Sequence, residues 1–307
     1  MSDQNSVTEL LDDKVFTDTR NHAMTPVAPG YPTLDLSFRQ AATFLTRQAK
    51  QVRITVVGLG GTGSWIAGQV ARTARVLIDA GRQVQVVLID ADRVSAANVP
   101  RSCFCEAEIG ELKVVALARR YSAAWGLGIG TIAELFKPEM ARVASNEDVL
   151  NVIVGCVDNA AARRAFAQVL ERRAPYGYYG YTGGTGSTLL IDCGNTRDGG
   201  QVLVGSVSRQ EEMRGSFKGR LLCTALPNPY WQHPELLEDL EEEQSDHNLS
   251  CAELMRRNAQ SLMVNHFVAG IAGDYLVRLL VTGNLRRYAT YFDLEACSTR
   301  NRCSDKV

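Results

Sequence analysis

The stretch that decides the fold is residues 53–64, Arg-Ile-Thr-Val-Val-Gly-Leu-Gly-Gly-Thr-Gly-Ser. Its first half is a compact run of β-branched residues, which predicts a strand ending at Gly58. Small residues with apolar positions at helical spacing follow over 61–80 and predict a helix. The glycines between them predict a tight turn. Strand, tight turn and helix in this order form the start of a βαβ unit, and such a turn lets the backbone and the helix N-terminus approach a phosphate.

The same alternation continues along the chain and predicts a buried, mostly parallel sheet. After about residue 175 it gives way to glycine-punctuated segments, which predict antiparallel or mixed strands that extend the sheet. We therefore expect a doubly wound α/β fold with a mixed sheet extension. The expected strands are 84–90, 129–136, 149–157, 176–181, 187–192, 201–207 and 286–294, and the further helices are 112–125, 159–173 and 251–282.

The composition and hydrophobic pattern also divide the chain into four expected segments. These are an N-terminal arm (1–45), an α/β domain that begins with the glycine turn motif (46–208), an irregular crossover segment (209–250) and a C-terminal helix and strand that complete the domain (251–307). An acidic run at 238–243 lies in the crossover segment and is typical of a solvated helix face.

Composition places the chain among ordinary globular proteins. Of its 307 residues, 45% are hydrophobic and 22% are charged, and the formal net charge is −1. This balance argues against a large basic face for nucleic acid. With no run of about 18 apolar residues and no secretory signal pattern, we expect a cytoplasmic protein with reduced thiols and no membrane span. Lysines are rare: Lys14, Lys50, Lys113, Lys137, Lys218 and Lys306.

The glycine turn alone leaves two enzyme classes open. Gly58, Gly60 and Gly63 form a GxGxxG pattern, and Asp90 ends the second strand, where an acid that binds ribose belongs. On these residues a dinucleotide-dependent oxidoreductase is as good an interpretation as an enzyme that uses ATP.

Basic and amide side chains after the second strand favour ATP. Asn98, Arg101 and the rare Lys113 follow Asp90 closely, and a triphosphate needs such partners for its roughly three to four negative charges. Asp158 and Asn159 follow a later strand at the same carboxyl edge of the sheet, where a carboxylate is well placed for Mg²⁺.

Taken together, these motifs resemble the ThiF/MoeB/HesA superfamily of ubiquitin-activating-enzyme-like adenylyltransferases. The resemblance covers about residues 50–225, with a weaker tail to the end of the chain. Its motifs are GxGGxGS (58–64), DxDxVxxxNxxR (90–101), IGxxK (109–113) and V-D-N-x-x-x-R (157–163). Within the superfamily, 192–195 with 200–201, and 251 through 260–262 to Asn265, are similar to the ThiF-type proteins of bacterial PRTRC operons. Ala97 and Ser102 depart from the usual Ser and Gln.

The resemblance implies a reaction and a set of site residues. In it, a protein's C-terminal carboxylate attacks the α-phosphorus of ATP and gives an acyl-adenylate and pyrophosphate. Asp90 would bind the ribose, Asn98, Arg101 and Lys113 the triphosphate, and Asp158 a magnesium ion. The implied nucleotide-binding set is Gly58, Gly60, Gly61, Gly63, Ser64, Asp90, Asp92, Asn98, Arg101, Lys113, Asp158 and Asn159. A non-catalytic adaptor that keeps the fold is the other alternative, disfavoured because these residues are all present.

Many superfamily members then pass the acyl group to a cysteine, and Cys223 is the candidate here. It precedes Pro227 in the irregular segment, similar to the crossover-loop cysteine of the superfamily, where we expect an exposed thiol. Cys251 is the rival, while Cys156 and Cys193 lie in apolar strand context and predict core packing. Two Cys-x-x-Cys pairs are absent, so structural zinc is not expected.

The resemblance also implies partners. The substrate would be a small ubiquitin-like or sulfur-carrier protein, whose tail residues 176–186 could receive, and a conjugating enzyme could follow. Superfamily members are usually homodimers, and an arginine of the N-terminal arm, such as Arg20, sometimes reaches the neighbouring site.

Overall fold

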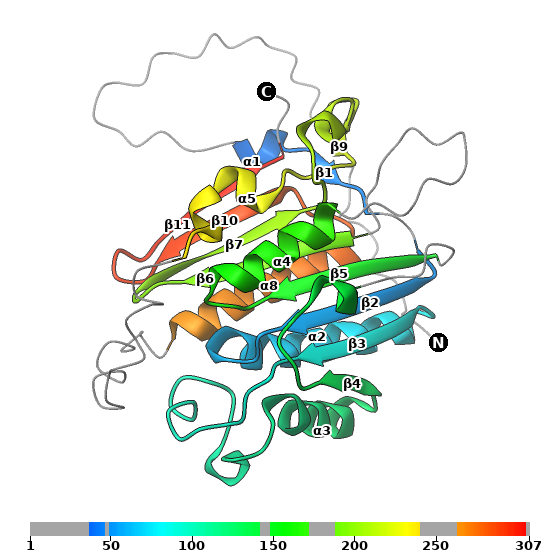
Figure 1. The fold of residues 1–307 in the computed structure, drawn as a ribbon. Helices are drawn as coiled ribbons and strands as arrows, with labels where there is room; N and C mark the ends of the chain where they lie inside the picture. Colours follow the sequence, from blue (N-terminus) through cyan, green and yellow to red (C-terminus); the bar gives the residue numbers. More distant parts are fainter. Residues whose placement is uncertain (1–36, 47–48, 142–147, 172–187, 240–262, 305–307) are drawn as a thin grey trace, which may run out of the picture. The chain divides into compact units, whose positions relative to one another are not determined.

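The structure is a computed structural model that describes residues 37–46, 49–141, 148–171, 188–239 and 263–304 (Figure 1). The expected strand at 176–181, the tail groove at 176–186, Arg20 and Cys251 lie outside these residues.

An eight-stranded sheet forms the centre of the fold, in the order β11-β10-β7-β6-β5-β2-β3-β4. Its strands are β2 (Gln51–Val57), β3 (Gln83–Ile89), β4 (Ile129–Ile132), β5 (Val149–Gly155), β6 (Thr188–Asn195), β7 (Gly199–Gly205), β10 (Arg287–Asp293) and β11 (Ser298–Cys303). The strands β2 to β6 pair in parallel, and β7, β10 and β11 each pair antiparallel with the preceding neighbour. This confirms the doubly wound α/β fold with a mixed extension.

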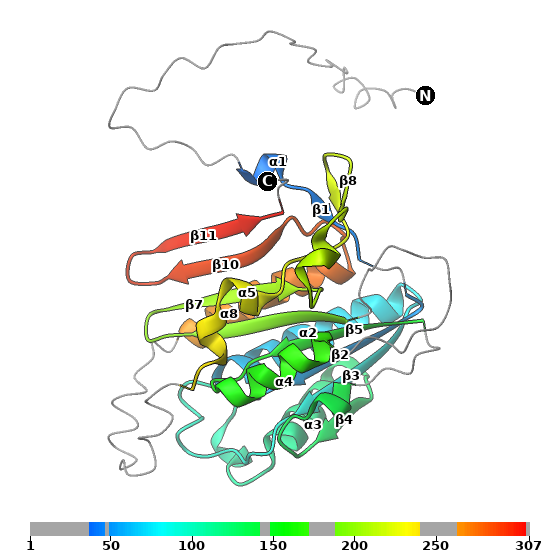
Figure 2. The same cartoon turned by 45° about the horizontal axis from the view of Figure 1, so that its top comes forward.

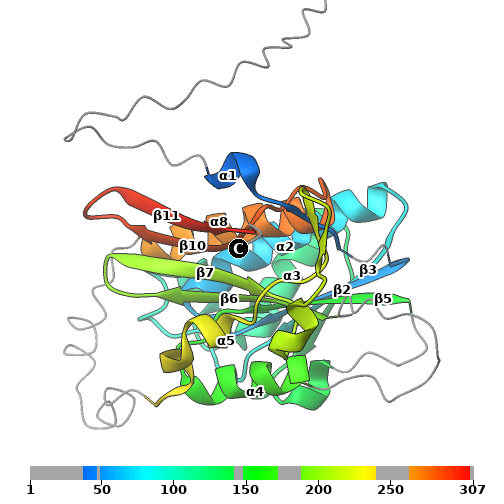
Figure 3. The same ribbon diagram turned by 90° about the horizontal axis from the view of Figure 1, so that it is seen from above.

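Helices cover both faces of this sheet (Figures 1 and 3). On one face lie α2 (Gly61–Asp79), α3 (Lys113–Trp125) and α8 (Val264–Leu280), which pack with alternate strand residues such as Val52, Ile54 and Val56. The opposite face carries α4 (Ala160–Glu171), which packs through Phe166 against Ile153 and its neighbours. All seven residues of β5 are buried, as expected for a parallel strand that is covered on both faces.

The segments around this core are short. They comprise α1 (Ser37–Gln40), α5 (Pro229–Gln232) and the 3₁₀ turns η1 (Glu106–Glu108), η2 (Pro138–Ala141), η3 (Gln210–Met213) and η4 (Pro234–Leu237). A separate three-stranded sheet joins β1 (Thr43–Phe44), β9 (Leu222–Cys223) and β8 (Phe217–Lys218), in the order β1-β9-β8 (Figure 2). Residues 43–44, from the expected N-terminal arm, thus pair with the expected crossover segment.

Most expected elements agree with the structure within a few residues, with one addition at the end. The strand expected at 286–294 is β10, but β11 follows it and forms the edge of the sheet. Its sequence, Ser-Thr-Arg-Asn-Arg-Cys, shows no apolar alternation because all but its last residue are exposed.

Candidate active site

The turn between β2 and α2 has the geometry of a phosphate-binding turn. Gly58 has a φ of +81°, and a Cβ there would lie 2.6 Å from the carbonyl oxygen of Cys156, so only glycine fits. A Cβ at Gly63 would overlap the carbonyl oxygen of Gly58. Beside Gly60, by contrast, no described atom lies within 4 Å of the Cβ position, and Gly60 has no side chain to cap α2. The first N–H groups of α2 therefore receive no side-chain cap from Gly60, and they lie at the positive end of the helix dipole.

An acidic and basic cluster lies at the carboxyl ends of β2 and β3. Asp90 accepts hydrogen bonds from the N–H groups of Leu59 (2.5 Å) and Asp92 (2.8 Å), which ties it to the glycine turn. The Lys113 ammonium lies 2.8 Å from Asp92 Oδ2 and 4.0 Å from Asp90 Oδ1. The side chains of Asp90 and Lys113 are only 8% and 7% exposed. Burial raises the pKa of Asp90, and the Leu59 N–H and Lys113 oppose that rise.

The loop that carries Asn98 and Arg101 is folded on itself. Asn98 Oδ1 accepts from the backbone N–H of Ser95 (2.9 Å) and from its hydroxyl (3.1 Å), so the amide oxygen shapes the loop. The backbone N–H groups of Arg101 and Ser102 both donate to the carbonyl of Asn98. The Arg101 side chain is half-buried and makes no ion pair among the described residues. Of the two predicted cations, Lys113 is thus paired with a carboxylate and Arg101 is not, as far as the described residues show.

Ser64 connects that loop to the glycine turn. Its hydroxyl donates to the carbonyl of Gly61 (2.9 Å) and accepts from the backbone N–H of Cys103 (2.9 Å). The Ser64 hydroxyl is buried and acts as both donor and acceptor, and both of these hydrogen bonds are to protein backbone groups. The sequence identified this serine as a motif position but gave no indication of this contact.

Asp158 and Asn159 follow β5, directly after Cys156 and Val157, which lie against Gly58 of the glycine turn. Asp158 is exposed, and Asn159 Oδ1 accepts from the Ala162 N–H (2.9 Å) at the start of α4. Asn159 thus occupies the N-cap position of α4, a role that its residue type favours. The Asp158 carboxylate remains directed to solvent at the carboxyl edge of the sheet, with the Asn159 amide 3.4 Å away.

Beneath Asp158 lies a buried ion pair that the sequence did not reveal as a pair. Arg163 donates to the carbonyl of Val157 (2.8 Å), and its Nε lies 3.6 Å from Asp192 Oδ2. Burial raises the pKa of Asp192 and Arg163 opposes the rise, while burial and the Asp192 charge raise the pKa of Tyr230. Arg163 and Asp192 were both in quoted motifs, but their contact joins α4 to β6 and leaves no local sequence signal.

The expectation that Cys223 is an exposed loop thiol is wrong. Cys223 lies in β9, pairs with Phe44 of β1 and is fully buried. Burial raises its pKa to about 11. The irregular, proline-containing sequence suggested a loop, but the segment pairs as a strand with β1, from the other end of the chain.

Of the other cysteines, Cys156 and Cys193 follow the packed context expected for them, whereas Cys105 and Cys297 are exposed. Cys193 is buried in β6, Cys156 is half-buried directly after β5, and the described cysteines form no disulfide with one another. Among the described residues, no group of three or more His, Cys, Asp or Glu side chains could hold a metal ion.

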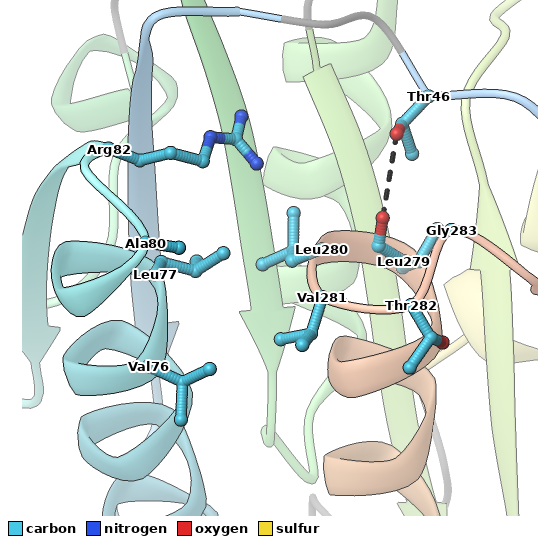
Figure 4. A pocket seen from close by; sticks show the side chains of 10 residues that line it. All are labelled: Thr46, Val76, Leu77, Ala80, Arg82, Leu279, Leu280, Val281, Thr282 and Gly283. Atoms are coloured by element: carbon cyan, nitrogen blue, oxygen red, sulfur yellow. Dashed lines mark hydrogen bonds between the residues drawn. The ribbon is translucent and has the colours of Figure 1, made fainter.

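A cavity of 340 Å³ lies at the far ends of the helices that begin at this site (Figure 4). The C-terminal residues of α2 and α8, among them Leu77, Ala80 and Leu280, line it, and Thr46 donates to the Leu279 carbonyl at its rim (3.4 Å). Its charged side chain, Arg82, donates to the carbonyl of Ala49 (2.8 Å). The cavity is therefore remote from the predicted nucleotide residues, at the amino edge of the sheet.

Comparison with known sequences agrees with this geometry. The family model described as "ThiF family" matches residues 35–302. The chain belongs to the ThiF family. No match was found among curated protein sequences. Among the helices of the described ranges, none has the length and apolar character needed to cross a membrane.

Solved structures of ThiF-like fold resemble the chain. A PaaA structure has a TM-score of 0.52 and 18% identity, and the match covers 84% of this chain and 66% of that one. The E. coli MccB structure with ATP has a TM-score of 0.52 and 12% identity, with 85% and 65% covered. E. coli MccB with AMPCPP and MccA has a TM-score of 0.50 at 13% identity, with the same coverage. The chain thus spans slightly less than two thirds of these proteins, and at such identities the likeness establishes the fold.

Proposed function

We propose that this ThiF-family chain is an adenylyltransferase that uses ATP to activate the C-terminal carboxylate of a small ubiquitin-like or sulfur-carrier protein. One observation carries the proposal: the uncapped glycine turn, the Asp90–Lys113 cluster and Asp158 share the carboxyl edge of one parallel sheet. This edge is where open α/β sheets bind nucleotides. MccB structures have been solved with ATP and with AMPCPP and MccA, which supports a nucleotide and a second substrate here.

The nucleotide would contact groups that differ in character. The N–H groups after Gly60 would donate hydrogen bonds to the phosphate oxygens. Asp90, held by the Leu59 N–H, would accept a hydrogen bond from a ribose hydroxyl with its remaining lone pairs. Arg101 would approach the triphosphate directly. Lys113 would release Asp92 and bind a phosphate instead. Because the Asp92 side chain is 69% exposed, breaking this ion pair costs little free energy.

Magnesium fits the donor set at Asp158. The carboxylate is exposed and follows Val157, which lies against Gly58. Mg²⁺ is usually held by one or two carboxylates together with substrate phosphates and waters. When bound, the ion would neutralise charge on the phosphates. Asp158 would hold it, and the Arg163 contact with Val157 would fix the backbone that carries Asp158.

The proposed reaction needs no general base from the protein. The attacking carboxylate is already ionised, so its oxygen attacks the α-phosphorus, the bond to the β-phosphate oxygen breaks, and pyrophosphate leaves. Orientation and charge neutralisation by Arg101 and Lys113 are the contributions expected from the protein. Removing one such cation typically slows a reaction by about 10²- to 10³-fold.

The proposed reaction ends at the acyl-adenylate. A thioester on Cys223 would require β9 to separate from β1 first, since Cys223 is fully buried and its pKa is about 11. Downstream conjugation is therefore left to a separate acceptor.

A homodimer is part of the proposal. Exposed apolar side chains occur near the C-terminal ends of α2 and α8, including Val277 and, at the cavity, Val76 and Val281, and α8 has few charged residues. Light scattering after size exclusion should give twice the chain mass of 33.6 kDa, and a mass of one chain would contradict the dimer.

ATP–pyrophosphate exchange tests the activity. We expect exchange that depends on a carrier protein with a free C-terminal tail and falls about 10²-fold or more in Lys113→Ala and Asp158→Ala. Lys137→Ala is the matched control, because Lys137 is an exposed lysine paired with Glu134. Exchange at the wild-type rate in both site variants would reject this reaction, and tight binding of NAD⁺ without ATP would favour the oxidoreductase alternative.

A further inference from the structure

A buried amide joins the two segments that the proposed function assigns to the phosphates. Asn265, the second residue of α8, is 1% exposed. Its Oδ1 accepts from the Thr62 hydroxyl (3.2 Å) and from the Asn195 amide. Its Nδ2 donates to the backbone carbonyl of Arg101 (3.4 Å). One side chain thus contacts the first turn of α2, the end of β6 and the Arg101 loop.

The Asn265 amide packs closely enough against the glycine turn to fix its distance from the Arg101 loop. A Cβ at Gly61 would overlap the Asn265 amide, so the glycine turn rests directly on it. On the other side of the same loop, the Ser64 hydroxyl accepts from the Cys103 N–H. The backbone around Arg101 is therefore held to the turn at two points, Arg101 itself and Cys103, and the two ties come from different helices.

Asn195 sets the orientation of the Asn265 amide. Its Nδ2 can only donate, and it faces Asn265 Oδ1 and the Thr62 hydroxyl (3.4 Å). This leaves the Nδ2 of Asn265 directed at the Arg101 carbonyl. A side chain that supplies an acceptor on one side and a donor on the other is required here, which among neutral residues of this size means asparagine.

We propose that Asn265 is a positioning residue for nucleotide binding: its amide holds the glycine turn and the Arg101 loop at the separation that a bound triphosphate needs. The inference rests on the proposed function. The Arg101 guanidinium can meet the phosphates only if its backbone keeps this distance from the N–H groups of α2, and small misplacements of such groups have large effects. Asn195 acts through Asn265 by fixing the amide.

Binding of Mg·ATP to the full-length chain, measured by calorimetry, tests this role. Asn265→Leu removes both hydrogen-bonding groups with little change in volume and should raise the Kd about tenfold. Asn151→Leu is the matched control, because Asn151 is fully buried in β5 and donates to the Ala141 carbonyl (3.2 Å) away from the site. Both variants should lower the Tm, but Asn151→Leu should leave the Kd within about twofold.

Two further readouts separate positioning from general stability. The double variant Arg101→Ala/Asn265→Leu should lose less affinity than the product of the two single losses, because both changes act on the same contact. Thr62→Ser, which keeps the donor to Asn265, should bind Mg·ATP more tightly than Thr62→Val. Without nucleotide, hydrogen exchange at 61–64 and 101–103 should accelerate in Asn265→Leu and stay unchanged in Asn151→Leu.

The outcomes distinguish this inference from the function on which it rests. If the wild-type chain does not bind Mg·ATP, the proposed function fails. If the wild type binds and Asn265→Leu binds equally well, only the positioning role is overturned. Full multiplicativity in the double variant, or equal acceleration of exchange in the Asn151→Leu control, also overturns it.

Discussion

The ammonium group of Lys113 lies 2.8 Å from the Asp92 carboxylate, so the rare lysine of the predicted triphosphate site is paired with an acid of the same motif. The two residues differ in burial: the Lys113 side chain is 7% exposed, and that of Asp92 is 69% exposed. The carboxylate thus faces solvent while the cation stays fixed beneath it. A phosphate could replace Asp92 without moving the buried part of the lysine.

Asp92→Asn tests this exchange. Removing the competing charge should tighten Mg·ATP binding about two- to fivefold, the range expected for a partly exposed pair. Calorimetry on the wild type and the variant measures it, with Asp198→Asn, at an exposed ion pair with Arg197, as the control. Binding weakened tenfold would instead indicate that Asp92 itself contacts the nucleotide, as the sequence motif implies.

Asp158 and Asn159 should separate ligand binding from stability. Asn159→Ala removes the N-cap contact with Ala162 and should lower the free energy of unfolding by about 1 kcal/mol. Asp158→Ala, at an exposed carboxylate, should leave stability within about 0.5 kcal/mol and abolish the magnesium dependence of ATP binding. Urea unfolding and magnesium titrations measure both. A loss of stability in Asp158→Ala equal to that in Asn159→Ala would contradict the assignment.

Cys223 should resist thiol reagents in the folded chain. With a pKa of about 11, about one thiol in a thousand is ionised at pH 8, and burial blocks access as well. Mass spectrometry after brief alkylation should find Cys105 and Cys297, which are exposed, modified first. Cys223→Ser should support normal pyrophosphate exchange in the presence of carrier. Rapid labelling of Cys223 would show that β9 opens.

The buried pair of Arg163 and Asp192 should give a pH signature. Because the pKa of Asp192 is raised in the folded state above the ordinary 3.8, folding favours the protonated acid. The stability contributed by this group is present below pH 3.8 and is lost as the pH rises through the folded-state pKa. Asp192→Asn cannot ionise, so its stability relative to the wild type should increase with pH from about 3.8 upward. Urea unfolding across this range measures the difference, and a decrease would reverse the assigned direction.

Local sequence patterns predicted the alternating strands and helices of this fold well. The β-branched run before Gly58 and the helical spacing after it correspond to β2 and α2, because periodicity and glycine placement are local properties. The alternation of strands and helices also predicted the parallel pairing of the strands. The glycine-punctuated segments after about residue 175 also indicated the antiparallel extension.

Contacts between distant segments were not predictable in the same way. Nothing near Cys223 indicates that Phe44 pairs with it, and nothing near Asn265 indicates that its amide faces Gly61. Asn98 and Ser64 were identified as motif positions, but their hydrogen bonds to Ser95 and Cys103 depend on how the loop folds. Motif spacing therefore located the edge of the sheet that forms the site, while the internal support of that site required the three-dimensional arrangement.

The small sheet has a consequence for the order in which the chain folds. The N–H groups of residues 42–45 donate to the carbonyls of Ser304, Leu221, Leu285 and Cys223, in that order. All four acceptors are synthesised after the whole parallel half of the sheet. Closing such long loops is slow and is rewarded only at the end. On a growing chain, β1 can therefore pair with β9 only after residue 223 has been made, and the backbone hydrogen bonds of residues 42–45 are complete only after Ser304.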